Sequence, residues 1–127
     1  MAVVVGFIPT EVGFAALRAA REEAERRGGP LVVVNVQRDG DEDDPRHADE
    51  VQLDRAVESL HRAAVRTDVR AVRTEDDVAS ALLDVIDQEK AELLVIGIRR
   101  EMGVARHLLG VTAQKLLLSA PCDVLAV

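Results

Sequence analysis

Short apolar runs recur along the chain, and one further segment alternates apolar with charged residues. The runs cover Ala2–Phe7, Leu31–Val36 and Glu92–Ile98. Runs of this length that are rich in branched apolar residues are typical of strands buried on both faces of a sheet. The segment "DVRAVRT", residues 68–74, alternates and therefore predicts a more exposed strand near a sheet edge. A last short strand is expected over Asp123–Val127.

Segments with helical spacing of apolar residues separate these strands. Helices are expected over Glu11–Arg27, Ala48–Arg66, Val78–Lys90 and Gly110–Ser119. Thr10 is placed to cap the first helix, and Asp76 or Asp77 the third. Strands that alternate with helices predict a doubly wound α/β fold, in which helices cover both faces of a five-stranded parallel sheet.

Ligands of such sheets bind beyond the carboxyl ends of the strands, where the strand order reverses. The first and fourth strands end in the two most irregular glycine-containing turns, so the candidate site is placed there. The length of 127 residues predicts a single domain over residues 1–127. No internal repeat or linker is apparent in the sequence.

Composition narrows the function. The net charge of −7 disfavours nucleic acid and anionic membranes as partners, and 2% aromatic residues leave little for base stacking. The one cysteine, Cys122, excludes an internal disulfide and a cysteine-rich zinc site, and its apolar setting suggests an inert thiol. The N-terminal run is short and has no basic leader, so a soluble cytoplasmic protein is expected.

The fourth strand and the residues after it carry a more specific pattern. Gly97 ends a strand, Gly110 lies thirteen residues later after "LL", and the chain closes with "APCDVLAV". This resembles the universal stress protein family, whose members show G-x2-G-x9-G-[ST] at this place, and the resemblance extends along the whole chain. It implies the strand order 3-2-1-4-5, frequent homodimers, and binding of ATP or AMP in some members.

Three positions depart from the family pattern. Arg100 replaces the second glycine, Val111 replaces the Ser or Thr after the third, and Ile8 replaces an acidic residue near the adenine. A left-handed backbone conformation at Arg100 would cost about 1–2 kcal/mol. Either the loop after the fourth strand follows a different backbone path from that of the family, or position 100 does not require a positive φ. Thr112 is the nearest hydroxyl that could replace the one lost at Val111.

The resemblance nevertheless defines a candidate site for a phosphorylated ligand. The turn after the first strand, the end of the second strand and the loop before the last helix would surround it. The cofactor-binding candidates are Gly6, Phe7, Ile8, Pro9, Thr10, Asn35, Val36, Gly97, Arg99, Arg100, Gly103, Arg106, Gly110, Val111 and Thr112. Asn35 and Val36 would flank the base, and the residues from Gly97 onward would hold the phosphates.

The arginines of this loop have two interpretations of equal weight. Arg99, Arg100 and Arg106 can grip a phosphate with paired hydrogen bonds. Alternatively they form a solvated basic loop that pairs with Glu101 and other acids. The first interpretation makes the protein a nucleotide-binding regulatory domain, and the second favours a dimeric interaction module that binds no nucleotide.

Other residue patterns give weaker signals. Asp39–Glu50 places carboxylates at several positions of a calcium loop but has Asp44 where glycine is required, so a charged surface loop is expected. Because this loop follows the second strand, it is expected on the ligand side of the sheet, where flanking a nucleotide or weak Mg2+ binding are minor alternatives. Of the three histidines, only His107 is expected near the site. No serine lies in a nucleophile elbow, and no base or metal ligand set is visible, so catalysis is limited at most to slow ATP hydrolysis.

The strand at the chain end, Asp123, Val124, Leu125, Ala126 and Val127, has little sequence after it to cover its outer edge. An open apolar edge strand is a liability unless it is paired. Antiparallel pairing with the same strand of a second copy is therefore expected, as the family resemblance also implies.

Overall fold

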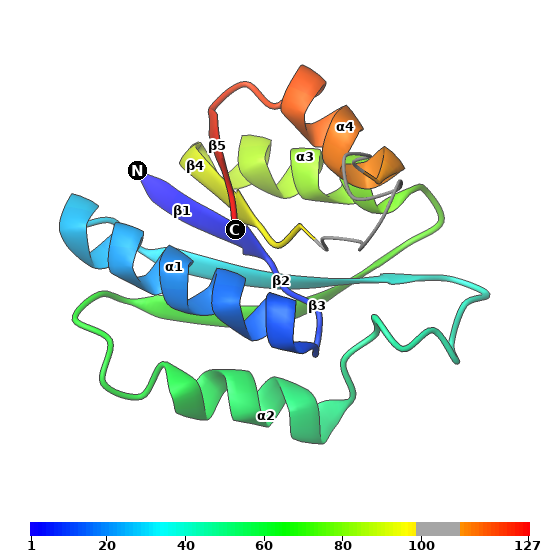
Figure 1. The fold of residues 1–127 in the computed structure, drawn as a ribbon, viewed down its shortest axis with the longest axis horizontal. Coiled ribbons are helices and arrows are strands. Elements are labelled where there is room, and N and C mark those ends of the chain that lie inside the picture. The colour runs from blue at the N-terminus through cyan, green and yellow to red at the C-terminus, as the bar shows by residue number, and fades with distance from the viewer. Residues whose placement is uncertain (99–109) are drawn as a thin grey trace, which may run out of the picture.

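The computed structural model describes residues 1–98 and 110–127, in which five strands alternate with four helices (Figure 1). The elements are β1 (Ala2–Gly6), α1 (Glu11–Arg27), β2 (Leu31–Arg38), α2 (Glu50–Ser59), β3 (Thr67–Thr74), α3 (Val78–Glu89), β4 (Ala91–Ile96), α4 (Val111–Ser119) and β5 (Asp123–Ala126). All neighbouring strands are parallel, in the order β3-β2-β1-β4-β5. This confirms the predicted fold class and strand order.

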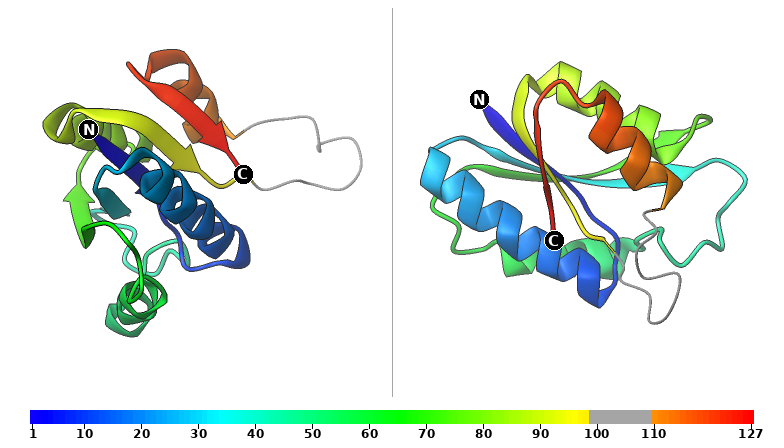
Figure 2. Two further views of the ribbon diagram at one scale, coloured as in Figure 1. Left: turned by 90° about the vertical axis from the view of Figure 1, so that its left-hand side faces the viewer. Right: turned by 45° about the horizontal axis from the view of Figure 1, so that its top comes forward.

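The sheet is covered on both faces. Helices α1 and α2 lie on one side of it and α3 and α4 on the other (Figures 1 and 2). Successive residues of a strand point to opposite faces. Val3 and Val5 therefore belong to the hydrophobic cluster under α1, whereas Val4 belongs to the cluster under α3. Continuous apolar runs are needed in β1, β2 and β4 because both faces of these strands are buried.

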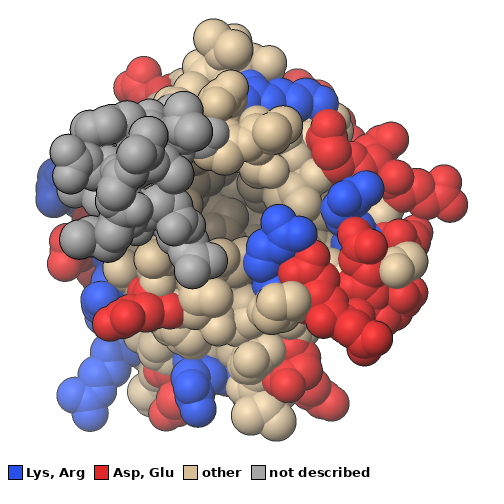
Figure 3. Space-filling view, turned by 45° about the vertical axis from the view of Figure 1, so that its right-hand side comes forward, with Lys and Arg blue, Asp and Glu red and all other residues tan. Residues whose placement is uncertain are grey.

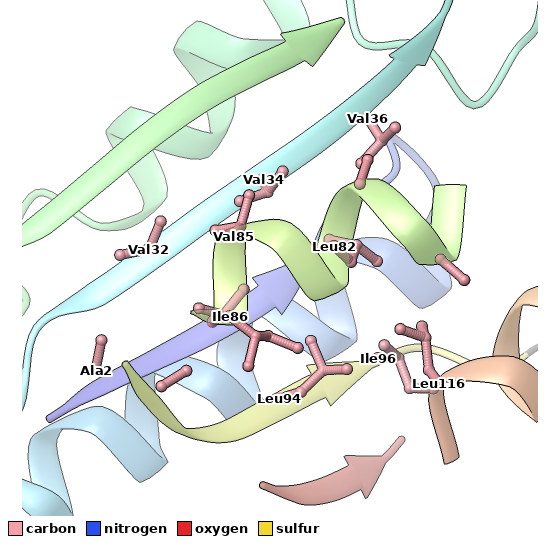
Figure 4. Close-up of a cluster of buried hydrophobic side chains, with 14 residues drawn as sticks. Ala2, Val32, Val34, Val36, Leu82, Val85, Ile86, Leu94, Ile96 and Leu116 are labelled. Atoms are coloured by element: carbon pink, nitrogen blue, oxygen red, sulfur yellow. The ribbon is translucent and has the colours of Figure 1, made fainter. Parts of the chain in front are cut away.

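The cluster under α3 and α4 reaches the carboxyl end of the sheet. Figure 4 shows Val34 and Val36 of β2, Leu82 of α3, Ile96 of β4 and Leu116 of α4 as one apolar layer. Each of these side chains is less than a tenth exposed. This apolar layer therefore offers a hydrophobic contact surface to a molecule bound at the carboxyl end of the sheet.

Helix α2 is shorter than predicted. The expected helix over Ala48–Arg66 was wrong at both ends, because it spans only Glu50–Ser59. Asp49 caps its first turn in a capping box with Gln52. Beyond the helix, the backbone N–H of Ala64 donates to a carboxylate oxygen of Glu25 on α1 (2.7 Å), which helps to turn the chain toward β3.

Strand β5 is an edge of the sheet. Val127 extends its pairing with β4, because its N–H donates to the carbonyl of Ile96 (2.9 Å) and its carbonyl accepts from the N–H of Ile98 (2.8 Å). The predicted position of this strand at an edge is confirmed. Within residues 1–98 and 110–127, no helix is long and apolar enough to cross a membrane.

Candidate functional site

A cavity of about 440 Å3 lies at the carboxyl ends of β1, β2 and β4, beside the first turn of α4. Figure 3 shows a hollow on one face, with basic side chains on one rim and a wide acidic surface beyond them. The cavity lies where the strand order reverses between β1 and β4, as predicted for a doubly wound sheet. Its described lining consists of Gly6, Phe7, Ile8, Gly13, Val34, Val36, Arg38, Asp44, Arg46, His47, Val78, Leu82, Ile96, Gly97, Ile98, Gly110, Val111, Thr112, Ala113 and Leu116.

Many of the candidate residues meet in this cavity. Those that line it are Gly6, Phe7, Ile8, Val36, Gly97, Gly110, Val111 and Thr112. Four others lie outside the described residues, namely Arg99, Arg100, Gly103 and Arg106. The two interpretations of the arginine loop therefore both stay predictions.

Pro9 and Thr10 belong to the turn after β1 but not to the cavity lining. Thr10 has the capping role that the sequence predicted. Its side-chain oxygen accepts a hydrogen bond from the N–H of Gly13 (3.1 Å), which satisfies one free donor of the first turn of α1. Thr10 thus fixes the start of α1 from outside the cavity.

Asn35 does not flank the cavity as hypothesised, because its side chain is fully buried and used within the protein. Its amide Nδ2 donates to the carbonyls of Phe7 and Arg46, both at 2.9 Å. Its Oδ1 accepts from the N–H of Ala48 (2.9 Å) and from Nε2 of Gln37 (3.1 Å). All donors and acceptors of this amide are therefore engaged, and Asn35 joins the turn after β1 to the loop after β2.

The sequence placed the loop after the second strand on the ligand side of the sheet, but the residues of one wall of the cavity were not among the candidates. Arg38, Asp44, Arg46 and His47 line it from the end of β2 and the loop after it. The expectation that His107 alone among the histidines lies near the site was wrong, since His47 lies there and His107 is outside the described residues. The position of these residues in the sequence could have identified them, because any loop after β2 starts on the ligand side of the sheet.

Hydrogen bonds order this wall. Nε and Nη2 of Arg46 donate to the carboxylate of Asp44 at 3.0 and 2.6 Å. These bonds, with the backbone N–H of Arg46, hold the pKa of Asp44 well below its ordinary value and raise the pKa of Arg46. Nε2 of His47 accepts a hydrogen bond from the backbone N–H of Arg38 (3.2 Å), which ties the loop to the end of β2.

Two glycines permit close packing at the cavity, Gly13 between α1 and the turn after β1, and Gly97 between the end of β4 and α1. A β-carbon on Gly13 would lie 1.7 Å from the carbonyl oxygen of Ile8, and one on Gly97 would lie 2.5 Å from Cγ1 of Val12. Neither glycine has a positive φ. Gly97, the first glycine of the motif, is thus explained by close packing against α1.

Gly110 differs, because an added β-carbon would meet no described atom within 4 Å and its φ is −64°. It is the N-cap of α4 and provides no side-chain cap. The N–H groups of the first helical turn have no partner inside a helix, and those of Val111, Thr112 and Ala113 belong to residues that line the cavity. Together with the helix dipole they suit an anion.

The position of α4 is fixed by Lys115. Its Nζ donates to Oδ2 of Asp77 (2.9 Å) and to the hydroxyl oxygen of Ser80 (2.8 Å), both at the start of α3. Asp77 is also the N-cap of α3, as predicted. The ammonium group of Lys115 and the donors of Ser80 hold the pKa of Asp77 well below its ordinary value.

Among the described residues, no group of three or more His, Cys, Asp or Glu side chains is arranged to hold a metal ion. The acidic loop after β2 instead uses carboxylates for ion pairs. Asp39 pairs with Arg73 (3.2 Å), Asp41 with Arg38 (3.5 Å), and Asp44 with Arg46.

Comparison with known proteins assigns the family. Residues 1–127 match the profile of the universal stress protein family. The chain belongs to the universal stress protein family. A universal stress protein of Mycolicibacterium smegmatis is 38% identical over 125 residues, which are 98% of this chain and 95% of that protein. A Mycobacterium tuberculosis universal stress protein is 31% identical, but this chain spans only 47% of its length.

Solved universal stress proteins share the fold. One, in complex with cAMP, superposes with a TM-score of 0.80 at 22% identity and covers 100% of this chain and 96% of its own. Another, from Archaeoglobus fulgidus in complex with dAMP, has a TM-score of 0.72 at 24% identity, and the match covers 98% of this chain and 94% of that one. At these identities the likeness concerns the fold.

Proposed function

We propose that this universal stress protein is a regulatory domain that binds an adenine nucleotide, ATP or AMP, or another phosphorylated small molecule in the cavity. The observation that carries the proposal is the first turn of α4, where Val111, Thr112 and Ala113 line a cavity with an apolar layer beneath it and their N–H groups have no partner among the described residues. The cAMP and dAMP complexes of two proteins with this fold support it.

The two parts of the cavity suit the two parts of a nucleotide. Ile8, Val34 and Val36 offer apolar surface to a base near β1 and β2. The N–H groups in the first turn of α4 would hold the phosphate. With Ile8 in place of an acidic residue, the base would be held more by apolar contact than by a charged hydrogen bond.

Magnesium is proposed only as a companion of the phosphates of ATP. Mg2+ usually keeps several waters and binds through one or two carboxylates plus phosphate oxygens. The arginine loop, Arg99, Arg100 and Arg106, is proposed as a further phosphate contact on the strength of the sequence alone.

The test is calorimetric titration with AMP, with ATP and Mg2+, and with adenosine, at low and moderate salt. Val111→Pro removes one backbone N–H at the first helical position of α4, where proline is well tolerated. We expect AMP binding to weaken about tenfold in this variant, because one charge-assisted hydrogen bond is lost. Adenosine binding should change little.

Val111→Ala is the matched control, because it also replaces the exposed side chain but keeps the N–H. Equal AMP affinity in the proline and alanine variants would show that the N–H of Val111 at the start of α4 does not bind the phosphate. An absence of binding to any of the three compounds at millimolar concentration would overturn the nucleotide proposal itself.

A dimeric interaction module is the second candidate. It is favoured by the outer edge of β5, with which no described strand pairs, and by the neighbouring helix α4, where Leu118 is 87% exposed and Leu117 43%. Because Val127 directs its N–H and carbonyl toward β4, those of Ala126 point to the open edge. A second copy is proposed to pair there, through Asp123–Val127.

Ala126→Pro tests this pairing, because it removes an edge N–H without touching a hydrogen bond to β4. Ala126→Ser is the control that keeps the N–H. Sedimentation should give a dimer for the native chain and the serine variant and a monomer for the proline variant. A native monomer at all concentrations would overturn the proposal.

A further inference from the structure

The charged side chains in the described lining of the cavity all lie on one wall. Of the described lining residues, Arg38, Asp44, Arg46 and His47 are the only ones with titratable side chains. They come from the end of β2 and the loop after it, and two arginines face one aspartate. In a chain of net charge −7, a cavity wall with an excess of arginine is unusual.

This wall is held in place from inside the protein. Asn35, which is fully buried, donates to the carbonyl of Arg46 and accepts from the N–H of Ala48, so it binds the loop on both sides of His47. Nε2 of Gln37 also donates to the carbonyl of Ala48 (2.9 Å). The segment from Arg46 to Ala48 is therefore preorganised before any ligand arrives.

The guanidinium group of Arg46 is oriented as well. Asp44 takes up Nε and one N–H of Nη2, whereas Nη1 makes no hydrogen bond to any described residue. Guanidinium groups carry five N–H donors in a rigid plane, so an oriented group still offers its other edge. That edge can receive a phosphate or carboxylate without breaking the pair with Asp44.

This wall and the start of α4 are reached from different strands of the sheet. Strand β1 lies between β2, which leads into the wall, and β4, which leads toward α4. Two strand spacings separate β2 from β4, about 9–10 Å. A single phosphate group is smaller than this strand spacing, so the wall and the start of α4 are expected to contact different groups of a ligand.

We infer that the ligand of this cavity carries a second anionic group, separate from the one at the start of α4, and that Arg46 binds it at the β2 wall. The inference rests on the proposed nucleotide function and narrows the ligand to nucleotides with phosphate at two separate places. Arg38 lines the same wall and adds positive charge, although Asp41 pairs with it.

The experiment compares two nucleotides with the same number of phosphates. ADP carries both on the 5′ position, whereas 3′-phosphoadenosine 5′-phosphate carries one at each end of the ribose. Calorimetry on the native chain should give binding about tenfold tighter for the second compound, the value of one additional charge-assisted hydrogen bond.

Arg46→Gln combined with Asp44→Asn removes the ion pair of the wall without changing the net charge. In this variant the affinity ratio of the two nucleotides should fall to about one. Arg73→Gln combined with Asp39→Asn is the matched control, because it removes another surface pair after β2 that does not line the cavity. The control should keep the native ratio.

The outcomes separate this inference from the proposed function. If ADP binds but the native ratio is near one, the second anionic group is refuted and the nucleotide function stands. A native ratio that survives the loss of Arg46 and Asp44 also overturns the assignment to this wall. If neither compound binds, the nucleotide function fails and the inference fails with it.

Discussion

A β-carbon placed on Gly97 would lie 2.5 Å from Cγ1 of Val12 and 3.1 Å from its carbonyl oxygen. The chain just after β4 therefore packs tightly against the side chain and the backbone of Val12 in the first turn of α1. This contact closes one side of the cavity, since Gly97 and Gly13 both line it. The first motif glycine is needed here for packing between two elements.

Gly97→Ala is accordingly expected to destabilise the fold by about 1–3 kcal/mol, the usual cost of forcing a methyl group into a packed site. Urea unfolding followed by circular dichroism measures this. Gly110→Ala is the comparison, because no described atom lies within 4 Å of its added β-carbon and its φ suits any residue. Its expected cost is under about 1 kcal/mol. Equal losses in the two variants would contradict the packing argument.

The contact between Lys115 and Asp77 should make stability depend on pH. The pKa of Asp77 is lowered in the folded state, first by the ammonium group of Lys115. A carboxyl group with a lowered folded pKa contributes stability that is complete at neutral pH and is lost as the pH falls below about 4. Lys115→Met should therefore unfold more easily than the native chain at pH 7, and this difference should shrink on acidification.

Thermal unfolding between pH 7 and pH 2 measures that difference. Asp77→Asn serves as the second variant, because asparagine still caps α3 but carries no charge. The double variant should show no further loss beyond either single one. A difference between native and Lys115→Met protein that is constant over the whole pH range would argue against the pair.

Asn35→Ala should destabilise the chain by about 1–3 kcal/mol, because the carbonyl of Phe7 and the N–H of Ala48 lose their buried partner. Gln37→Ala is the milder control, since Gln37 is only half-buried. Hydrogen exchange provides a local measurement. The N–H of Ala48 should exchange faster in Asn35→Ala than global unfolding alone explains, and unchanged protection there would refute the anchoring role.

Cys122 is expected to react slowly with thiol reagents at neutral pH. Burial raises the pKa of its thiol, and the carboxylate of Asp123 raises it further, so little thiolate is present. Labelling with an aromatic disulfide reagent at pH 7.5 should be slower for the folded chain than for the same chain in denaturant. Asp123→Asn should speed the folded reaction modestly, and a rate equal to that of the unfolded chain would contradict the expectation.

The strands could be predicted because burial on one or both faces produces a recognisable local pattern of apolar residues. Val3, Val4 and Val5 alternate between two covered faces, so no polar residue is tolerated in that run. The alternating residues of β3 likewise reflect its place at an edge. Once these elements were recognised, the ends of parallel strands had to meet, and this argument together with the family resemblance placed Ile8, Val36 and Gly97 in the cavity.

The cavity wall formed by Arg38, Asp44, Arg46 and His47 could not be predicted residue by residue in the same way, because its position depends on the path of an irregular loop. That path is set by the four hydrogen bonds of Asn35, which join residues up to 28 positions apart. The one local signal was the polar residue inside the apolar run "LVVVNV". A buried amide must be hydrogen-bonded, so Asn35 indicated an internal anchor better than a ligand contact.

The cavity borders on both hydrophobic layers of the protein. Leu82 and Leu116 line it from the layer under α3 and α4, and Phe7 lines it from the layer under α1. A molecule bound in the cavity would thus contact both hydrophobic layers at the end of the sheet at the same time. Occupancy should then slow the opening of helices on both sides together, including helices that the ligand never touches.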